Sequence, residues 1–207
     1  TRTSSSAASD VYKRQQWYNE ELQATTDRLE NVRVDNGLLK ITAKKENYGG
    51  KNYTSGRVRT YQKLDFTYGR VDIRAKMPSK AGTWPALWML GSNYASLDWP
   101  KCGEIDILEH AGNRLNQIQS TVHHPDNYGS GDSNVTHEYN DVSTNFHVYS
   151  LVWTEKALTF YVDDKPFHIV GNACDLPFNW DFNIIVNVAM GGTCLLYTSP
   201  SPRDSMT

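Results

Sequence analysis

A succession of short segments with alternating apolar and polar residues constrains the fold of this chain more than any other feature. Alternation with period two places every second side chain on the same face of a strand. No apolar stripe with a period of 3.6 residues is long enough to predict a helix. The chain is therefore predicted to be all-β, an antiparallel sandwich or barrel. The alternating segments occupy 56–60, 69–76, 146–154, 158–163 and 182–189, with Gly, Pro, Asn and Asp between them.

Asn36-Gly37 is the strongest local signal for a hairpin. It predicts a tight turn between strands at Val32–Val34 and Leu38–Lys44. Neither a repeat nor a linker divides residues 16–193, so this segment is expected to form one domain, which is ordinary for a sandwich of this length.

Both ends of the chain differ from the middle. Residues 1–15 and 194–207 are rich in Ser, Pro and charge, and show neither strand nor helix periodicity. DVYKRQ and CLLYTSPSPRDS resemble translated sequencing-adaptor read-through; disordered natural termini are the alternative. Both ends are therefore excluded from fold prediction, Cys194 is not expected to belong to the natural protein, and the absence of a signal peptide carries no information on localisation.

The charge balance excludes several classes of partner. The net charge is −2, the pI is about 6.3, and no segment gathers Lys or Arg, which argues against nucleic acid and anionic membranes. No apolar run approaches the ~18 residues that cross a bilayer, so a soluble monomer is expected. Three cysteines without a C-x-x-C pair predict neither a disulfide framework nor a zinc site. Six Trp and twelve Tyr suit sugar binding, because a pyranose stacks its C–H face on a ring.

The segment 99–111, WPKCGEIDILEHA, carries the chemistry. Glu104 and Asp106 share one strand face, whereas Glu109 has the opposite parity. The apolar residues break parity at the same place, because Ile107 and Leu108 are adjacent. One β-bulge near 107–108 brings all three acids to one face and leaves the apolar residues on the other.

With that bulge, Glu104 and Glu109 lie about four strand steps apart, which leaves their carboxyl groups roughly 5–6 Å apart. Retaining glycosidases need ~5–5.5 Å, and inverting enzymes need more. Mutual repulsion should keep at least one of the three acids protonated near neutral pH. A solvated acidic face or a cation site would show the same spacing, but the Trp-rich flanks and the apolar back of the strand favour catalysis.

Glu104 to Glu109 resemble the E-x-D-x-x-E signature of glycoside hydrolase family 16, in the bulged form typical of laminarinases. The resemblance covers residues 16–193, with ELQ at 21–23, YTSGR at 53–57, YGRVDIRAKMP at 68–78, GTWPALWMLG at 82–91, TVH at 121–123, FHVYSLVWT at 146–154 and NVAMGG at 187–192. It implies a concanavalin-like β-jelly-roll, truncated at both ends, and a secreted, cell-surface or periplasmic enzyme. That enzyme would be an endo-hydrolase of β-1,3-glucan (laminarin) or mixed β-1,3/1,4-glucan that acts with retention.

The resemblance also implies roles for individual residues. Glu104 is the expected nucleophile, Glu109 the acid/base and Asp106 the residue that orients Glu104. The expected substrate-binding residues are Trp99, Trp88, His123, Asn187 and Arg59, with Arg57 as the alternative to Arg59. Trp84 is also a candidate, and its side chain is expected to face either the cleft or the core. No cofactor or catalytic metal is expected; a structural calcium near the Gly37 carbonyl remains conceivable in a full-length parent.

The sequence differs from the family pattern in two respects, and three alternative interpretations of the chain remain. Asp72 stands where the family more often has Glu, and the family's first and last strands are missing, which exposes sheet edges. The substrate could be another polysaccharide, such as agar, carrageenan or porphyran, although the near-neutral charge and His110 favour laminarin. The chain could instead be a glucan-binding protein, but such relatives usually lose a catalytic glutamate. It could also require the missing strands to fold.

Overall fold

The computed structural model describes residues 18–129 and 134–192; the two predicted foreign ends, and with them Cys194, lie outside the described residues. Apart from one 3₁₀ turn (η1), the secondary structure of these residues is all β, and none of their helices is long and apolar enough to cross a membrane. The elements are η1 (Tyr18–Glu20), β1 (Gln23–Thr25), β2 (Val32–Asp35), β3 (Leu38–Ile41), β4 (Lys44–Tyr48), β5 (Lys51–Ser55), β6 (Arg57–Arg59), β7 (Asp65–Phe66), β8 (Gly69–Ala75), β9 (Thr83–Gly91), β10 (Glu104–Glu109), β11 (Gln117–His123), β12 (Val135–Glu138), β13 (His147–Trp153), β14 (Ala157–Val162), β15 (Lys165–Gly171) and β16 (Phe182–Met190).

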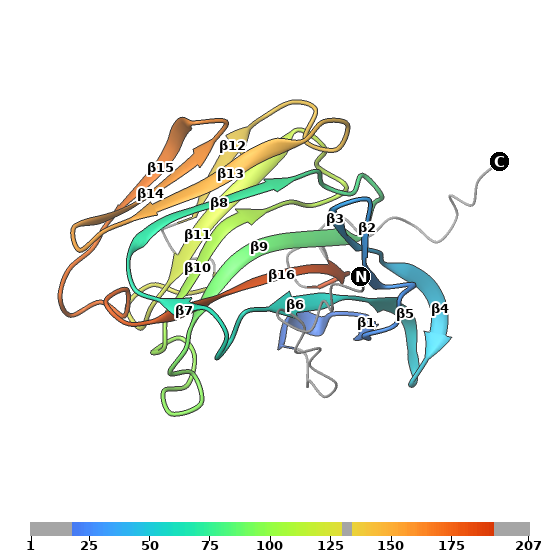
Figure 1. Cartoon of the computed structure of the whole chain (residues 1–207), viewed down its shortest axis with the longest axis horizontal. Helices are drawn as coiled ribbons and strands as arrows, with labels where there is room; N and C mark the ends of the chain where they lie inside the picture. Colours follow the sequence, from blue (N-terminus) through green and yellow to red (C-terminus); the bar gives the residue numbers. More distant parts are fainter. Residues whose placement is uncertain (1–17, 130–133, 193–207) are drawn as a thin grey trace.

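Two antiparallel sheets form the body of the molecule. The larger has the order β12-β11-β10-β9-β16-β6, with β7 also paired to β16, and the smaller has the order β15-β14-β13-β8. Figure 1 shows the smaller sheet lying over the strongly curved larger one. Two smaller sheets, β1-β5-β4 and β2-β3, lie toward the same end of the molecule as the carboxyl end of β16. This is the β-jelly-roll sandwich that the sequence predicted.

The core lies between the two main sheets, because the strands of both sheets turn alternate apolar side chains toward the space between them. β13 shows this most clearly: Tyr149, Leu151 and Trp153 are at most 1% exposed, and they face the buried side of β10 and β9. The indole of Trp153 is packed edge-on against Phe182, with ring centroids 5.3 Å apart, and its Nε1 donates a hydrogen bond of 3.0 Å to the carbonyl of Phe178.

Replacing Trp153 should therefore destabilise the whole sandwich. Trp153→Ala removes a large buried ring and leaves the Phe178 carbonyl without its donor, so we expect a loss of about 3–5 kcal/mol in the free energy of unfolding. Urea unfolding followed by circular dichroism measures this. Trp180→Ala is the matched control, because Trp180 is 46% exposed. A loss below about 1 kcal/mol for Trp153→Ala would contradict this account of the core.

The turn residues form the predicted hairpin. Asn36 and Gly37 both adopt positive φ, 51° and 77°, and they join β2 to β3 as a type I′ turn requires. The predicted strand Leu38–Lys44 is wrong in its second half. β3 ends at Ile41, opposite Val32, the first residue of its partner. The chain then leaves this sheet, and from Lys44 it pairs with β5 instead.

Candidate active site

A β-bulge interrupts β10 at the predicted position. Its register with β9 pairs Asp106 with Trp88 and then Leu108 with Leu87, so Ile107 is the extra residue. The register with β11 is shifted over the same residues. Ile107 and Leu108 are both buried, at 1% and 0% exposure. The bulge thus turns two successive apolar side chains into the core, and this structural prediction is confirmed.

Beyond the bulge, Glu109 returns to the sheet face that carries Glu104 and Asp106. Residues directly opposite each other in an antiparallel ladder share a face, so the register defines three rows of side chains across the larger sheet. The first row is Arg57–Asn187–Ala86–Glu109–Gln119–Thr136, the second is Arg59–Ile185–Trp88–Asp106–Thr121, and the third is Asn183–Leu90–Glu104–His123.

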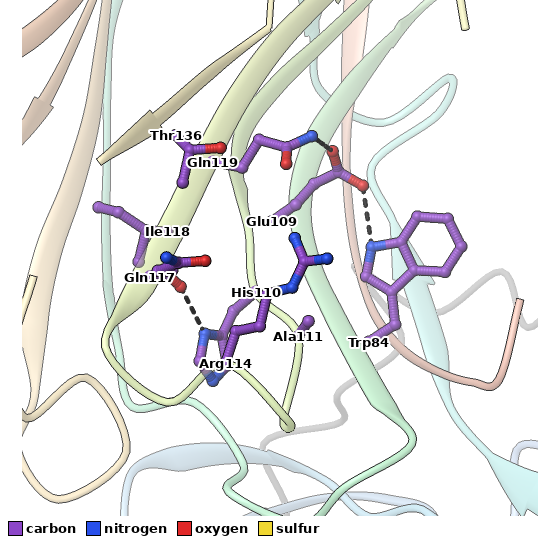
Figure 2. Close-up of a pocket in the computed structure, with 9 residues that line it drawn as sticks. All are labelled: Trp84, Glu109, His110, Ala111, Arg114, Gln117, Ile118, Gln119 and Thr136. Atoms are coloured by element: carbon purple, nitrogen blue, oxygen red, sulfur yellow. Dashed lines mark hydrogen bonds between the residues drawn. The ribbon is translucent and has the colours of Figure 1, made fainter. Parts of the chain in front are cut away.

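Glu109 is held through both of its carboxyl oxygens. Trp84 Nε1 donates a hydrogen bond of 2.9 Å to Oε1, and Gln119 Nε2 donates one of 3.3 Å to Oε2 (Figure 2). Trp84 is therefore in direct contact with one of the three acids. The weaker contact lies at Oε2, so Oε2 is the oxygen that can carry a proton with the smaller loss of hydrogen bonding.

Glu104, Asp106 and His123 form the other half of the site. His123 Nε2 lies 3.1 Å from Asp106 Oδ2, and its ring is tilted against that of Trp99 at 5.8 Å between centroids. Asp106 is 3% exposed, whereas Trp99 is 47% exposed. The Trp99 side chain also hydrogen-bonds Glu104. A half-exposed ring therefore stands directly beside a carboxyl group.

The pKa values of all three acids are raised. Burial raises the pKa of Glu104 to about 8, repulsion from Asp106 adds to this, and His123 opposes it. Burial and then repulsion from Glu109 raise the pKa of Asp106 well above its usual value. Burial also raises the pKa of Glu109, against the lowering effects of His123, Trp84 and Gln119. Glu104 and Asp106 are linked by a hydrogen bond. The hydrogen bond from Glu104 stabilises the Asp106 carboxylate, which lowers the pKa of Asp106 and partly offsets the effect of burial.

These shifts predict how stability depends on pH. A carboxyl group whose pKa is higher in the folded state binds protons more tightly there, so its stabilising contribution is complete below the unfolded pKa and is lost as pH rises through the folded one. The free energy of unfolding should fall as pH rises from about 5 through about 8, the pKa of Glu104.

Asp106→Asn should flatten this decline, because the variant removes the most buried charge of the three. Urea unfolding at a series of pH values measures the effect, with Asp175→Asn, on the exposed surface, as the matched control. Parallel curves for the wild type and Asp106→Asn would contradict the proposed repulsion.

The remaining predicted binding residues lie on the β16 and β6 side of the acids. Trp88 Nε1 donates a hydrogen bond of 2.7 Å to Asn187 Oδ1, and the guanidinium of Arg57 lies 4.6 Å above the Trp88 ring. Arg59 is turned toward two tyrosines: its Nη1 donates a hydrogen bond of 3.0 Å to the hydroxyl of Tyr94, and its guanidinium lies 5.0 Å from the ring of Tyr61. Arg57 therefore lies closer than Arg59 to the other predicted binding residues.

Sequence reasoning missed three residues that border the acids. Gln119 bonds to Glu109, Thr121 lies opposite Asp106, and Tyr128 packs edge-on against Trp99 with 5.5 Å between ring centroids. The alternation in QIQSTVH, 117–123, places Gln119 and Thr121 on the face of His123 and could have identified both. No sequence pattern points to Tyr128, which follows a turn after β11.

Within the described residues, one group has the donors for a metal ion. Glu104, Asp106 and His123 each offer a donor atom within 4.8 Å of the others. These are the same groups that acid–base chemistry would use. Paired carboxyl groups in different environments, one able to keep a proton and one able to ionise, can serve as acid and nucleophile toward a substrate that lies across the strands.

Comparisons with known proteins all identify the same kind of protein. A family model described as "Glycosyl hydrolases family 16" matches residues 19–193. A β-glucanase of Rhodothermus marinus is 40% identical over 202 residues, which cover 85% of this chain and 66% of the relative. The chain thus spans slightly less than two thirds of that protein.

Solved structures resemble the whole described sandwich. The laminarinase catalytic domain of Thermotoga maritima MSB8 superimposes with a TM-score of 0.83 at 36% identity, covering 91% of this chain and 79% of that one. A LamA variant of Zobellia galactanivorans, in complex with laminaritriose and laminaritetraose, gives a TM-score of 0.80 at 39% identity, with coverages of 90% of this chain and 81% of that one.

Proposed function

The chain belongs to glycosyl hydrolase family 16, and on that premise we propose that it is an endo-hydrolase that cleaves β-1,3-glucan such as laminarin, or mixed β-1,3/1,4-glucan, with retention of configuration. The observation that carries the proposal is the bulge in β10, which gathers Glu104, Asp106 and Glu109 on one face. The β-glucanase and laminarinase names of the relatives support the substrate class.

In the proposed first step, Glu104 attacks the anomeric carbon and the bond to the glycosidic oxygen breaks. Glu109 gives its proton to that oxygen, so the leaving sugar departs neutral and the attacked sugar becomes an ester of Glu104. In the second step Glu109, now ionised, takes a proton from water, and the hydroxide oxygen displaces Glu104. Two inversions give net retention.

The surroundings of the two glutamates suit these two roles. Glu104 attacks as the carboxylate, so in the reacting state the proton of the Glu104–Asp106 hydrogen bond must reside on Asp106. Burial keeps Glu109 protonated toward neutral pH, and Trp84 and Gln119 stabilise its anion once the proton is gone. The separation of roughly 5–6 Å predicted from sequence for the carboxyl groups of Glu104 and Glu109 is the one that a retaining mechanism requires.

The same geometry suggests where the attacked sugar and its neighbours bind. Trp99 would form a wall beside the sugar at Glu104, and Trp88 would offer a second ring. Asn187 and Arg57 would donate hydrogen bonds to hydroxyl groups on the β16 and β6 side, with His123 completing the pocket at Asp106. These residues line one continuous face, so a polymer could pass over them without an end, as internal cleavage requires.

Parallel digestion tests the proposal. Laminarin, lichenan, agarose and carrageenan are incubated with the protein, products are identified by mass spectrometry, and the first-formed anomer is read by proton NMR. We expect laminarin to give a ladder of oligosaccharides whose new reducing ends appear first as the β-anomer. Products from agarose or carrageenan alone would refute the substrate class, an α-anomer would refute retention, and tight laminarin binding without cleavage would indicate a binding protein.

A further inference from the structure

Three donor atoms on β10 and β11 converge at the nucleophile end of the site. Glu104, Asp106 and His123 each offer one donor atom, and these atoms all lie within 4.8 Å of one another. Glu104 is directly opposite His123 in the ladder between the two strands, so both side chains stand on the same face. Two carboxylate oxygens and one imidazole nitrogen form a donor set that zinc accepts, whereas calcium and magnesium prefer oxygen ligands.

One oxygen of Asp106 points into this group and is buried without a hydrogen bond. Asp106 is 3% exposed, and its Oδ2 accepts no hydrogen bond from the residues that the structure describes. Its contact is His123 Nε2, at 3.1 Å. A buried polar atom that has lost its water and gained no partner costs free energy, and a bound cation would offset this cost.

The distance between Asp106 and His123 matches one edge of a zinc coordination tetrahedron. Two ligands that each lie about 2.0–2.1 Å from zinc are about 3.3 Å apart. Asp106 Oδ2 and His123 Nε2 are 3.1 Å apart. The donor atom of Glu104 lies within 4.8 Å of both. A shift of at most about 1.5 Å, which the rotatable side chain of Glu104 allows, would complete a face of three ligands.

The surroundings of the group favour a cation with an open coordination position. Trp99, whose side chain hydrogen-bonds Glu104, is 47% exposed, so this side of the group borders solvent and water can serve as the fourth ligand. Glu109 is held by Trp84 and Gln119, and its carboxyl group lies on the same sheet face without being needed as a ligand. A positive ion among three acids relieves their mutual repulsion.

We propose that Glu104, Asp106 and His123 form a zinc site, and that Zn²⁺ bound there inhibits the enzyme reversibly. The ion is not a cofactor, because it occupies the carboxylate of Glu104 that attacks the anomeric carbon. The inhibitory consequence rests on the proposed function, whereas binding of the ion rests on the geometry of the three ligands. Zinc and the glucan chain need the same groups, so each excludes the other.

Calorimetric titration of the whole chain with Zn²⁺ tests the site without any substrate. We expect binding that EDTA reverses. In His123→Gln the Kd for zinc should rise at least about tenfold, because loss of an outer-shell partner alone weakens metal sites by about 10–100-fold. His124→Gln is the matched control, since the ring of His124 packs against Phe178 instead, 5.9 Å between centroids. Cys174→Ser, which removes an exposed thiol, should also leave the Kd unchanged. Thermal melting in EDTA verifies the folding of each variant.

Inhibition kinetics connect the site to the reaction. Zinc should raise the KM of the wild type for laminarihexaose and leave kcat unchanged, whereas Mg²⁺ and Ca²⁺ at the same concentrations should change neither. Equal zinc affinity in the wild type and His123→Gln, or no binding at about 1 mM zinc, would overturn the site. Binding that does not compete with the hexaose would overturn the inhibitory role. Zinc binding that depends on His123, in a protein that hydrolyses no glucan, would support the site and remove the proposed function.

Discussion

Glu104→Ser is expected to abolish the release of reducing sugar from laminarin, by a factor on the order of 10⁴ or more. Serine leaves no carboxylate to form the glycosyl ester, and Asp106 is too deeply buried to replace it. The variant should nevertheless fold, because it removes one of three acids that repel one another. Loss of activity without loss of stability is the signature that distinguishes a nucleophile from a structural residue.

Reducing-sugar assays and thermal melting together measure this result. Glu155→Ser provides the control, since Glu155 is an exposed residue of the turn between β13 and β14. Added azide should partly restore turnover of a laminaribiosyl fluoride donor of matching configuration by occupying the space of the missing carboxylate, and the product should be the α-azide. More than a few per cent of wild-type activity on laminarin in a folded Glu104→Ser protein would remove Glu104 from the mechanism.

The second large effect is expected at Glu109. Glu109→Ala should slow laminarin hydrolysis about a thousandfold, because the departing sugar oxygen then leaves without a proton. The loss with β-laminaribiosyl fluoride should be much smaller in the first step, since fluoride needs less protonation. Azide should react with the glycosyl–Glu104 ester without help from a base and give the β-azide, opposite in configuration to the product expected for Glu104→Ser.

The two azide products therefore assign the roles of the two glutamates independently of rate. Wild-type protein and Glu155→Ala, measured in the same azide concentrations, serve as references. If Glu109→Ala loses activity equally on both donors, and azide gives no glycosyl azide, Glu109 is not the acid/base. Exchange of the two expected anomers between the variants would exchange the two assignments.

The catalytic strand could be predicted from sequence because two independent patterns failed at the same place. The acidic residues change from even to odd sequence positions between Asp106 and Glu109. The apolar residues change from odd to even positions between Ile107 and Leu108. One extra residue in the strand explains both changes. The choice between Arg57 and Arg59 could not be predicted in the same way. They share a strand face, and only the packing of Arg57 on Trp88 and of Arg59 on Tyr61 separates them.

Two of the strands that sequence reasoning did not identify, β4 and β12, are polar. β4 reads KKENY and β12 reads VTHE, and neither has an apolar face because both lie at sheet edges, where little of the side-chain surface is buried. The Gly49-Gly50 pair, with φ of 56° and 81°, was a usable signal for the β4–β5 hairpin. The contacts of Gln119 and Trp84 with Glu109 depend on register between strands that are distant in sequence, which no local pattern encodes.

The bulge also determines which changes of length the catalytic strand can accept. Ile107 is the residue without a partner in the ladder with β9, so its deletion would restore unbroken pairing and leave the order of the three acids across the cleft as it was. The cost would fall on the core, which would lose one buried side chain. A single-codon deletion at Ile107 or at Leu108 would therefore leave the three acids in the same E-x-D-x-E spacing, whereas a deletion at Asp106 or Glu109 would remove an acid.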